Sequence, residues 1–201
     1  APSVGASQNH LSTAVMLRLF LQALLVVLLL GASPQISWAS STPWVEVIGL
    51  PVDVATDMAS LALHTCTQQG ASVSVSVVDA QGRLQVFLQG DHAAPHTAEL
   101  SRHKAYTAVS LAALQGFHTT SELSQALRQS KTPISMLPLP SDSIEGITPM
   151  AGGVVLRTNQ DQLLGGLGVS GARQGELDEQ CALAAERWLS SQRDGSTEPR
   201  L

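Results

Sequence analysis

Four histidines lie close together in the middle of the chain, and imidazole is the side chain that most often binds metal ions or haem iron. They are His92, His96, His103 and His118. On a helix, His96, His103 and Thr107 share one stripe, because they recur at near-helical intervals. Such a stripe indicates a ligand for an iron porphyrin or for a metal ion. The simpler interpretation of His103 is a surface pair with Glu99, four residues earlier.

A further histidine, His64, stands apart from this group in another expected helix. It is a candidate iron ligand from a different face, or an ordinary, partly exposed helix residue. The sequence lacks the H-E-x-x-H motif of zinc proteases and the G-x-S-x-G motif of serine hydrolases. We therefore assign no catalytic residue and lean towards a binding protein rather than an enzyme.

Residues 166–171 form a G-x-G-x-x-G motif between an expected strand and an expected helix. In a dinucleotide-binding fold this motif binds a pyrophosphate at the start of the helix. That fold needs another parallel strand after the helix, whereas this helix is the last expected element. Glu176, Asp178 and Glu179 would also repel a phosphate there. We interpret the glycines as a motif for a tight turn and close packing where the strand ends.

The composition limits the possible partners. The 201 residues carry 11 Lys and Arg against 16 Asp and Glu, a net charge of -5, which excludes a strongly basic nucleic-acid-binding surface. Hydrophobic residues make up 44% of the chain and charged residues 13%, as in a globular protein with a core.

The first 39 residues are interpreted as upstream residues followed by a cleavable signal peptide. The apolar run 17–32 contains one charge, Arg18, and a small-x-small site ends at Ala39, after which we predict cleavage. A transmembrane anchor is the alternative, but the run is shorter than the ~20 residues that a span needs, and Pro34 follows it. We expect an exported protein, periplasmic or secreted, with no stable membrane anchor.

Residues 40–192 are predicted to form one α+β domain, followed by a polar tail over 193–201. The element order is α-β-β-α-α-β-β-α, with two hairpins building an antiparallel sheet of four to five strands. The expected helices are 51–69, 96–116, 121–129 and 175–190. The expected strands are 72–77, with one buried face, 84–89, 152–157 and 162–169. The proline-rich segment 132–149 is expected to be a loop or an edge.

Two cysteines, Cys66 and Cys181, fall in expected helices. Export permits a disulfide between them. Two buried free thiols are an alternative that the sequence supports at least as well, because sequence does not show whether the side chains meet.

Several short motifs occur in a fixed order along the chain. They are V-V-D-x-x-G from Val77, K-A-Y-T-A from Lys104, T-S-E-L from Thr120, A-G-G from Ala151 and G-x-G-V-x-G-A from Gly166. This ordered set resembles the GlcG/HbpS family over residues 51–189, and the exported, haem-binding members are the more similar branch. The resemblance implies helices around an antiparallel sheet, a homo-oligomer, and haem binding outside the cytoplasm in haem sensing or iron handling.

The resemblance also implies a site on the helix that bears K-A-Y-T-A. In similar proteins the threonine is the candidate iron contact, which is Thr107 here, with Lys104 and Tyr106 beside it. Haem propionates are expected near Arg102 or Lys104.

Other relatives are thought to use a histidine, and imidazole is the more usual haem ligand. The corresponding candidates in this chain are His103, His96 and His64. Both options remain open at this point.

Two other functions fit the same scaffold. One is a small-molecule enzyme or a corrinoid-related metabolic protein. The other is an oligomeric interaction or signalling module, in which the helix stripe forms an interface. The sequence does not identify a sensor-protein partner.

Overall fold

The computed structural model describes residues 17–18, 48–129 and 145–195. The predicted signal peptide and its cleavage site lie almost wholly outside this part, as does most of the proline-rich segment 132–149. Chain contacts separate Ala1–Val45 from a compact unit, Glu46–Leu201, which contains all the elements described below. Among the described residues, no helix is long and apolar enough to span a membrane.

Four antiparallel strands form one sheet in the order β2-β1-β4-β3. They are β1 (Ser74–Asp79), β2 (Leu84–Gln89), β3 (Gly153–Arg157) and β4 (Leu163–Ser170). Each hairpin pairs neighbours in sequence, and β1 joins β4 in the centre. The predicted α+β class and the two hairpins are confirmed, because alternating side chains and short turns specify such hairpins locally.

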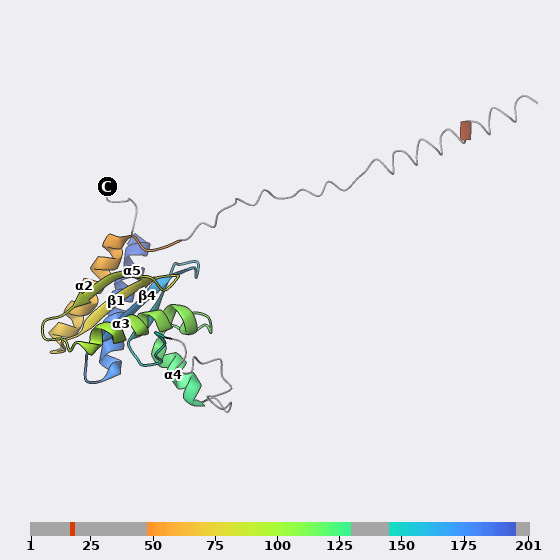
Figure 1. Ribbon diagram of the computed structural model, residues 1–201. Helices are drawn as coiled ribbons and strands as arrows, with labels where there is room; N and C mark the ends of the chain where they lie inside the picture. The colour runs from red at the N-terminus through yellow and green to blue at the C-terminus, as the bar shows by residue number, and fades with distance from the viewer. Residues whose placement is uncertain (1–16, 19–47, 130–144, 196–201) are drawn as a thin grey trace, which may run out of the picture. The chain divides into compact units, whose positions relative to one another are not determined.

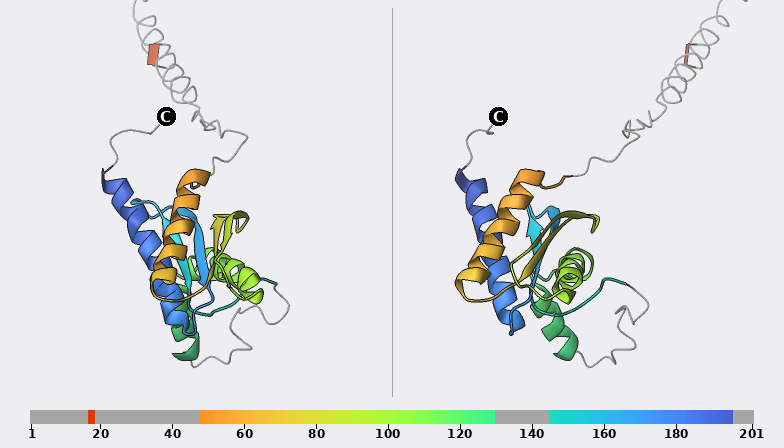
Figure 2. Two further views of the ribbon diagram at one scale, coloured as in Figure 1. Left: turned by 90° about the vertical axis from the view of Figure 1, so that its left-hand side faces the viewer. Right: turned by 60° about the vertical axis from the view of Figure 1, so that its left-hand side comes forward.

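Helices α2 (Val52–Gln68) and α5 (Gly175–Gly195) cover one face of the sheet (Figure 2). Val54 and Leu61 of α2 are only half-buried. The buried side chains of α2 are mostly small: Ala55, Met58, Ala59, Ala62 and Cys66. Small residues allow α2 and α5 to approach closely. Helix α5 also continues through Gly195, into the predicted polar tail.

Helix α3 (His96–Thr107) covers the opposite face of the sheet (Figures 1 and 2). It continues as a π-helical turn, η1 (Ala108–Ala112), and α4 (Thr120–Gln129) packs beside it. The prediction of one α-helix over 96–116 is therefore only partly right. Such π-turns frequently occur next to functional sites.

Strand β1 is buried on both faces, whereas the sequence predicted one buried face. Val75 and Val77 point towards α2 and α5, whereas Val78 and the two serines point towards α3. Ser74 Oγ lies 2.8 Å from Thr97 Oγ1, and Ser76 Oγ lies 2.8 Å from Ser101 Oγ. Because α3 supplies matching hydroxyls, the polar face of the strand is buried without unsatisfied groups.

The glycines of β4 allow α3 to lie directly on the sheet. A Cβ placed on Gly166 would lie 2.6 Å from the carbonyl oxygen of Ala105. One placed on Gly168 would lie 2.5 Å from the backbone nitrogen of the same residue. The G-x-G part of the motif therefore allows close packing of the strand against the helix.

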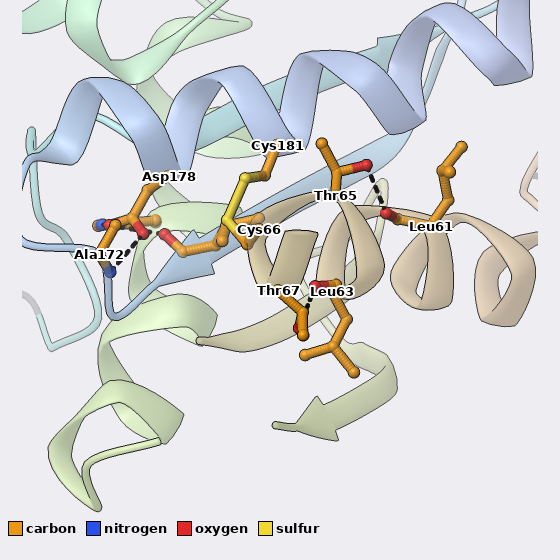
Figure 3. Close-up of a disulfide and its surroundings, with 10 residues drawn as sticks. Leu61, Leu63, Thr65, Cys66, Thr67, Ala172, Asp178 and Cys181 are labelled. Atoms are coloured by element: carbon orange, nitrogen blue, oxygen red, sulfur yellow. Dashed lines mark hydrogen bonds and ion pairs between the residues drawn. A yellow bond between two sulfur atoms is a disulfide. The ribbon is translucent and has the colours of Figure 1, made fainter. Parts of the chain in front are cut away.

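Cys66 of α2 and Cys181 of α5 form a disulfide, with an S–S distance of 2.09 Å (Figure 3). Both residues are fully buried. The alternative of two free thiols is therefore wrong. It could not be rejected from sequence, because the pairing depends on how the two helices face one another.

Candidate functional site

The side chains of the α3 stripe lie in two different environments. His96, Arg102, His103 and Tyr106 are at least partly exposed on the outer side of the helix. Thr107 and Lys104, by contrast, are buried. The structure therefore separates the predicted site residues into an outer set that faces solvent and an inner set that contacts the rest of the fold.

His103 retains 26% of its side-chain exposure in the middle of the outer face. Its Nε2 atom lies 3.2 Å from a guanidinium nitrogen of Arg102 and 3.7 Å from a carboxylate oxygen of Glu99. The predicted contact with Glu99 is thus present. All three groups are at the surface, where such ion pairs are weak and easily exchanged for a ligand.

Tyr106 lies between two loops that are distant in sequence. A Cβ on Gly82, in the β1–β2 turn, would lie 2.5 Å from Cε2 of the ring. A Cβ on Gly146 would lie 3.4 Å from Cδ1 of the same ring and 3.8 Å from Cδ2 of His103. Both glycines have positive φ angles, so these positions strongly favour glycine. The loops fix the aromatic ring beside the imidazole.

The hydroxyl of Thr107 is fully buried and makes two hydrogen bonds within the fold. It donates to the carbonyl oxygen of His103 at 2.7 Å and accepts from the backbone N–H of Thr148 at 2.7 Å. A hydroxyl has one proton to donate, and here that proton is directed at a carbonyl. Thr107 does not face a surface on which a porphyrin can lie.

Lys104 is 1% exposed and forms a buried ion pair. Its ammonium donates to Asp178 Oδ2 of α5 at 2.8 Å and to the carbonyl oxygen of Val169 at 2.9 Å. Gly152 makes room for it, since a Cβ there would lie 2.9 Å from Nζ. The expectation that Lys104 holds a haem propionate does not fit this burial. Its role here is to join α3 to α5 across the sheet.

The remaining histidines are not brought to the same place. His64 is exposed on α2, on the other face of the sheet, and its Nε2 lies 2.9 Å from Gln68 Nε2. His96 is exposed at the start of α3, two turns before His103, which is roughly 10 Å along a helix axis. His96 and His103 therefore cannot both bind one iron atom from the same side.

Two exposed apolar side chains of β2 lie next to α3, and the sequence analysis did not single them out. Leu84 is 50% exposed and Phe87 is 39% exposed. Phe87 pairs with Ser76 and Leu84 with Val78, and both partners face α3. Paired residues share a face of the sheet, so both apolar side chains lie on the α3 side. The signal in the sequence was an uncharged strand, LQVFLQ, in a hairpin that could form a sheet edge.

The carboxylate nearest to the Gly82 turn is Asp79. Burial alone would raise the pKa of this carboxyl. Hydrogen bonds from the backbone and guanidinium of Arg83 and from the backbone of Gln81 outweigh burial and lower the pKa below its ordinary value. Asp79 is therefore a charged cap that fixes the turn against which Tyr106 lies.

Comparisons with known proteins agree with this architecture. The family model described as "Haem degrading protein HbpS-like" matches residues 50–187. The crystal structure of an HbpS double mutant from Streptomyces reticuli is similar, with a TM-score of 0.62 and 34% identity over 79% of this chain and 98% of that one. A structure of a PduOC complex with haem has a TM-score of 0.59 and 28% identity, covering 70% of this chain and 94% of the other.

The ORFY protein of Klebsiella pneumoniae is also similar, with a TM-score of 0.63 and 26% identity over 76% of this chain and 99% of that one. No curated protein sequence matches the chain. The family match covers well over half of the chain and includes every strand described above. The resemblance inferred from the ordered motifs is confirmed, and the chain belongs to the HbpS-like family.

Proposed function

We propose that this chain is an exported haem-binding protein, and that haem lies against the outer face of α3 with His103 as the iron ligand. The observation that carries the proposal is the partly exposed imidazole of His103, on the helix that bears the K-A-Y-T-A motif. The family description and the haem complex of the PduOC neighbour support haem as the ligand.

The residues around His103 fit a porphyrin better than a bare metal ion. The described part of the chain contains no group of three or more His, Cys, Asp and Glu residues that could hold an ion. Haem iron needs only one or two ligands from the protein, because the porphyrin supplies the other four. A single accessible imidazole is therefore sufficient.

Apolar and cationic groups flank the imidazole in a way that suits the rest of haem. Leu84 and Phe87 present apolar surface on the same side of the sheet, and the fixed ring of Tyr106 lies between that strand's turn and His103. Arg102, on the other side, lies 3.2 Å from Nε2 of His103 and makes a surface pair with Glu99. Its guanidinium is free to exchange that partner for a propionate.

Export is supported by two independent features. The apolar run 17–32 and the small-x-small site have the organisation of a signal peptide. The disulfide between Cys66 and Cys181 is typical of proteins outside the reducing cytoplasm. Haem binding in that location suits haem sensing or iron handling. The homo-oligomer implied by the resemblance is part of this proposal, and light scattering measures it.

The second candidate function is haem degradation, which the family description favours. Binding and turnover are separable in one experiment. Haem bound to the protein is incubated with ascorbate in air, and the Soret band is followed with time. Loss of the band that is faster than for free haem establishes turnover, and a stable band supports binding alone.

The test of the binding site is a haem titration of the chain from Ser40, which contains the whole compact unit. We expect a saturable Soret shift, at least tenfold weaker binding in His103→Ala, and no change in His64→Ala, a matched imidazole on the far side of the sheet. Thr107→Val should bind haem like the parent if it folds, which circular dichroism checks. Loss of binding in folded Thr107→Val with retention in His103→Ala would overturn the ligand assignment.

A further inference from the structure

A hollow lies at the end of the sheet opposite the Gly82 turn. It is open to solvent on one side and has a volume of about 460 Å³, within the range of pockets for small molecules. Three loops form its walls: the end of α2 with the residues up to Ser72, the β2–α3 loop, and the β4–α5 loop. Tyr106 contacts the opposite end of the β1–β2 hairpin, so this cavity is separate from the site on α3.

Five polar side chains from these loops line the cavity: Gln69, Ser72, His92, Arg173 and Gln174. All five residues are exposed, and none of their side chains makes a hydrogen bond or an ion pair within the described ranges of the chain. They contribute nothing to holding the three loops together. Their donors are therefore available to a ligand.

The lining of the cavity contains one cationic side chain, that of Arg173, and no carboxylate. Of the three acids at the start of α5, Glu176 is exposed and does not line the cavity, and the other two are engaged elsewhere. Asp178 accepts from the Lys104 ammonium and from the Ala172 backbone, and Glu179 accepts from Ser121. The repulsion of an anion by these carboxylates, expected from the sequence, is thereby reduced.

The walls of the cavity are held firmly. Gly171 lies against the neighbouring loop so closely that a Cβ on it would be 2.8 Å from Cα of Val73. The backbone N–H of Ala71 donates to the carbonyl oxygen of Cys66, whose side chain is in the disulfide. His92 is held in the left-handed region, at φ 64°. The hollow is thus formed before any ligand binds.

We propose that this cavity binds a small organic oxyanion, a molecule with a carboxylate or phosphate group that is recognised by Arg173 and His92. A guanidinium binds either group through two parallel hydrogen bonds. The amides of Gln69 and Gln174 and the hydroxyl of Ser72 are placed to bind polar atoms of the rest of the molecule. The volume exceeds that of a bare ion, which is why the ligand has an organic body.

The test is isothermal titration calorimetry on the chain from Ser40, in a buffer free of both probes. Succinate and inorganic phosphate are titrated separately, so that the two arms distinguish a carboxylate from a phosphate ligand. We expect saturable binding of at least one probe. Arg173→Gln should weaken it at least fivefold and His92→Asn at least twofold, because asparagine adopts the same left-handed backbone without the imidazole.

The matched control is Arg128→Gln, which removes an exposed arginine of α4 outside the cavity. It should bind the probe within twofold of the parent. The proposal is overturned if neither probe binds saturably, or if Arg173→Gln and Arg128→Gln behave alike. No haem is present in these titrations, so their outcome is independent of the function proposed for α3.

Discussion

Lys104 is the residue around which the shared motifs of the chain come together. Its ammonium contacts Asp178 and the carbonyl oxygen of Val169, in the G-x-G-V-x-G-A motif. Gly152, in A-G-G, leaves the space that the ammonium fills. Thr120, in T-S-E-L, accepts a hydrogen bond from the backbone N–H of Gly153 at 2.9 Å. These motifs therefore maintain the fold, and their presence does not by itself mark ligand contacts.

Replacing Lys104 should lower the free energy of unfolding of the domain. Lys104→Met leaves Asp178 as an unpaired buried carboxylate, and removing one partner of a buried pair costs about 3–5 kcal/mol. Urea denaturation measures the free energy of unfolding. Arg83→Gln, which breaks an exposed pair with Asp79, is the control and should cost about 0–1 kcal/mol. Equal effects of the two changes would contradict the structural role of Lys104.

The charge on Asp79 should make the β1–β2 turn sensitive to acid. Folding lowers the pKa of this carboxyl from its ordinary 3.8. The charged carboxylate therefore stabilises the folded state fully above pH 3.8, and this contribution is lost as the pH falls through the folded pKa. Asp79→Asn should cost about 1 kcal/mol at neutral pH. The difference between variant and parent should shrink as the pH falls below 3.8 and vanish only below the folded pKa, as thermal melts at stepped pH can show. A difference that is constant with pH would exclude this origin.

At the scale of elements, the packing of α3 on β4 depends on the absence of side chains at Gly166 and Gly168. Gly168→Ala would place a methyl group against Ala105 and the carbonyl oxygen of Ser101. Overpacking of this kind typically costs about 1–3 kcal/mol. Gly49→Ala is the matched control, because a Cβ there meets nothing within 4 Å. Thermal denaturation should separate the two variants, and similar melting temperatures would refute the close contact.

The elements themselves were predictable where the pattern is local. The alternation of valine and serine specified β1, and Gly82 specified the turn that follows it. The burial of the serine face was not predictable, because it depends on Thr97 and Ser101 reaching it from α3. The π-helical turn η1 was also not predictable, because it depends on tertiary packing rather than on helix propensity.

The candidate site could be placed on a helix but not resolved into exposed and buried residues. His103 and Thr107 share a stripe in sequence. The segment at Thr148 covers Thr107, however, and leaves His103 accessible. Lysine side chains usually lie at the surface, and only the buried contact with Asp178 shows that Lys104 lies inside the fold. Sequence periodicity identifies neighbours on one helix, whereas exposure depends on segments that arrive from elsewhere in the chain.

At the scale of the whole molecule, the disulfide should be the largest single contribution to stability. It closes a loop with a sequence separation of 115 residues. Constraining an unfolded loop of this length is worth about 4–5 kcal/mol in the chain-entropy account. Cys66→Ala with Cys181→Ala should lower the free energy of unfolding by that order in urea. The parent in reducing agent is the comparison, and a loss below about 1 kcal/mol would contradict this account.

The same bond determines how the protein responds to mechanical force. A pull applied between the two ends of the chain passes through the Cys66–Cys181 bond, which joins α2 to α5. Only the chain before Cys66 and after Cys181 can lengthen. The whole sheet, α3 and α4 lie between the two cysteines and bear no tension. In a stretching experiment the proposed haem-binding face of α3 should therefore persist at loads that unravel the free ends of α2 and α5, until a reductant is added.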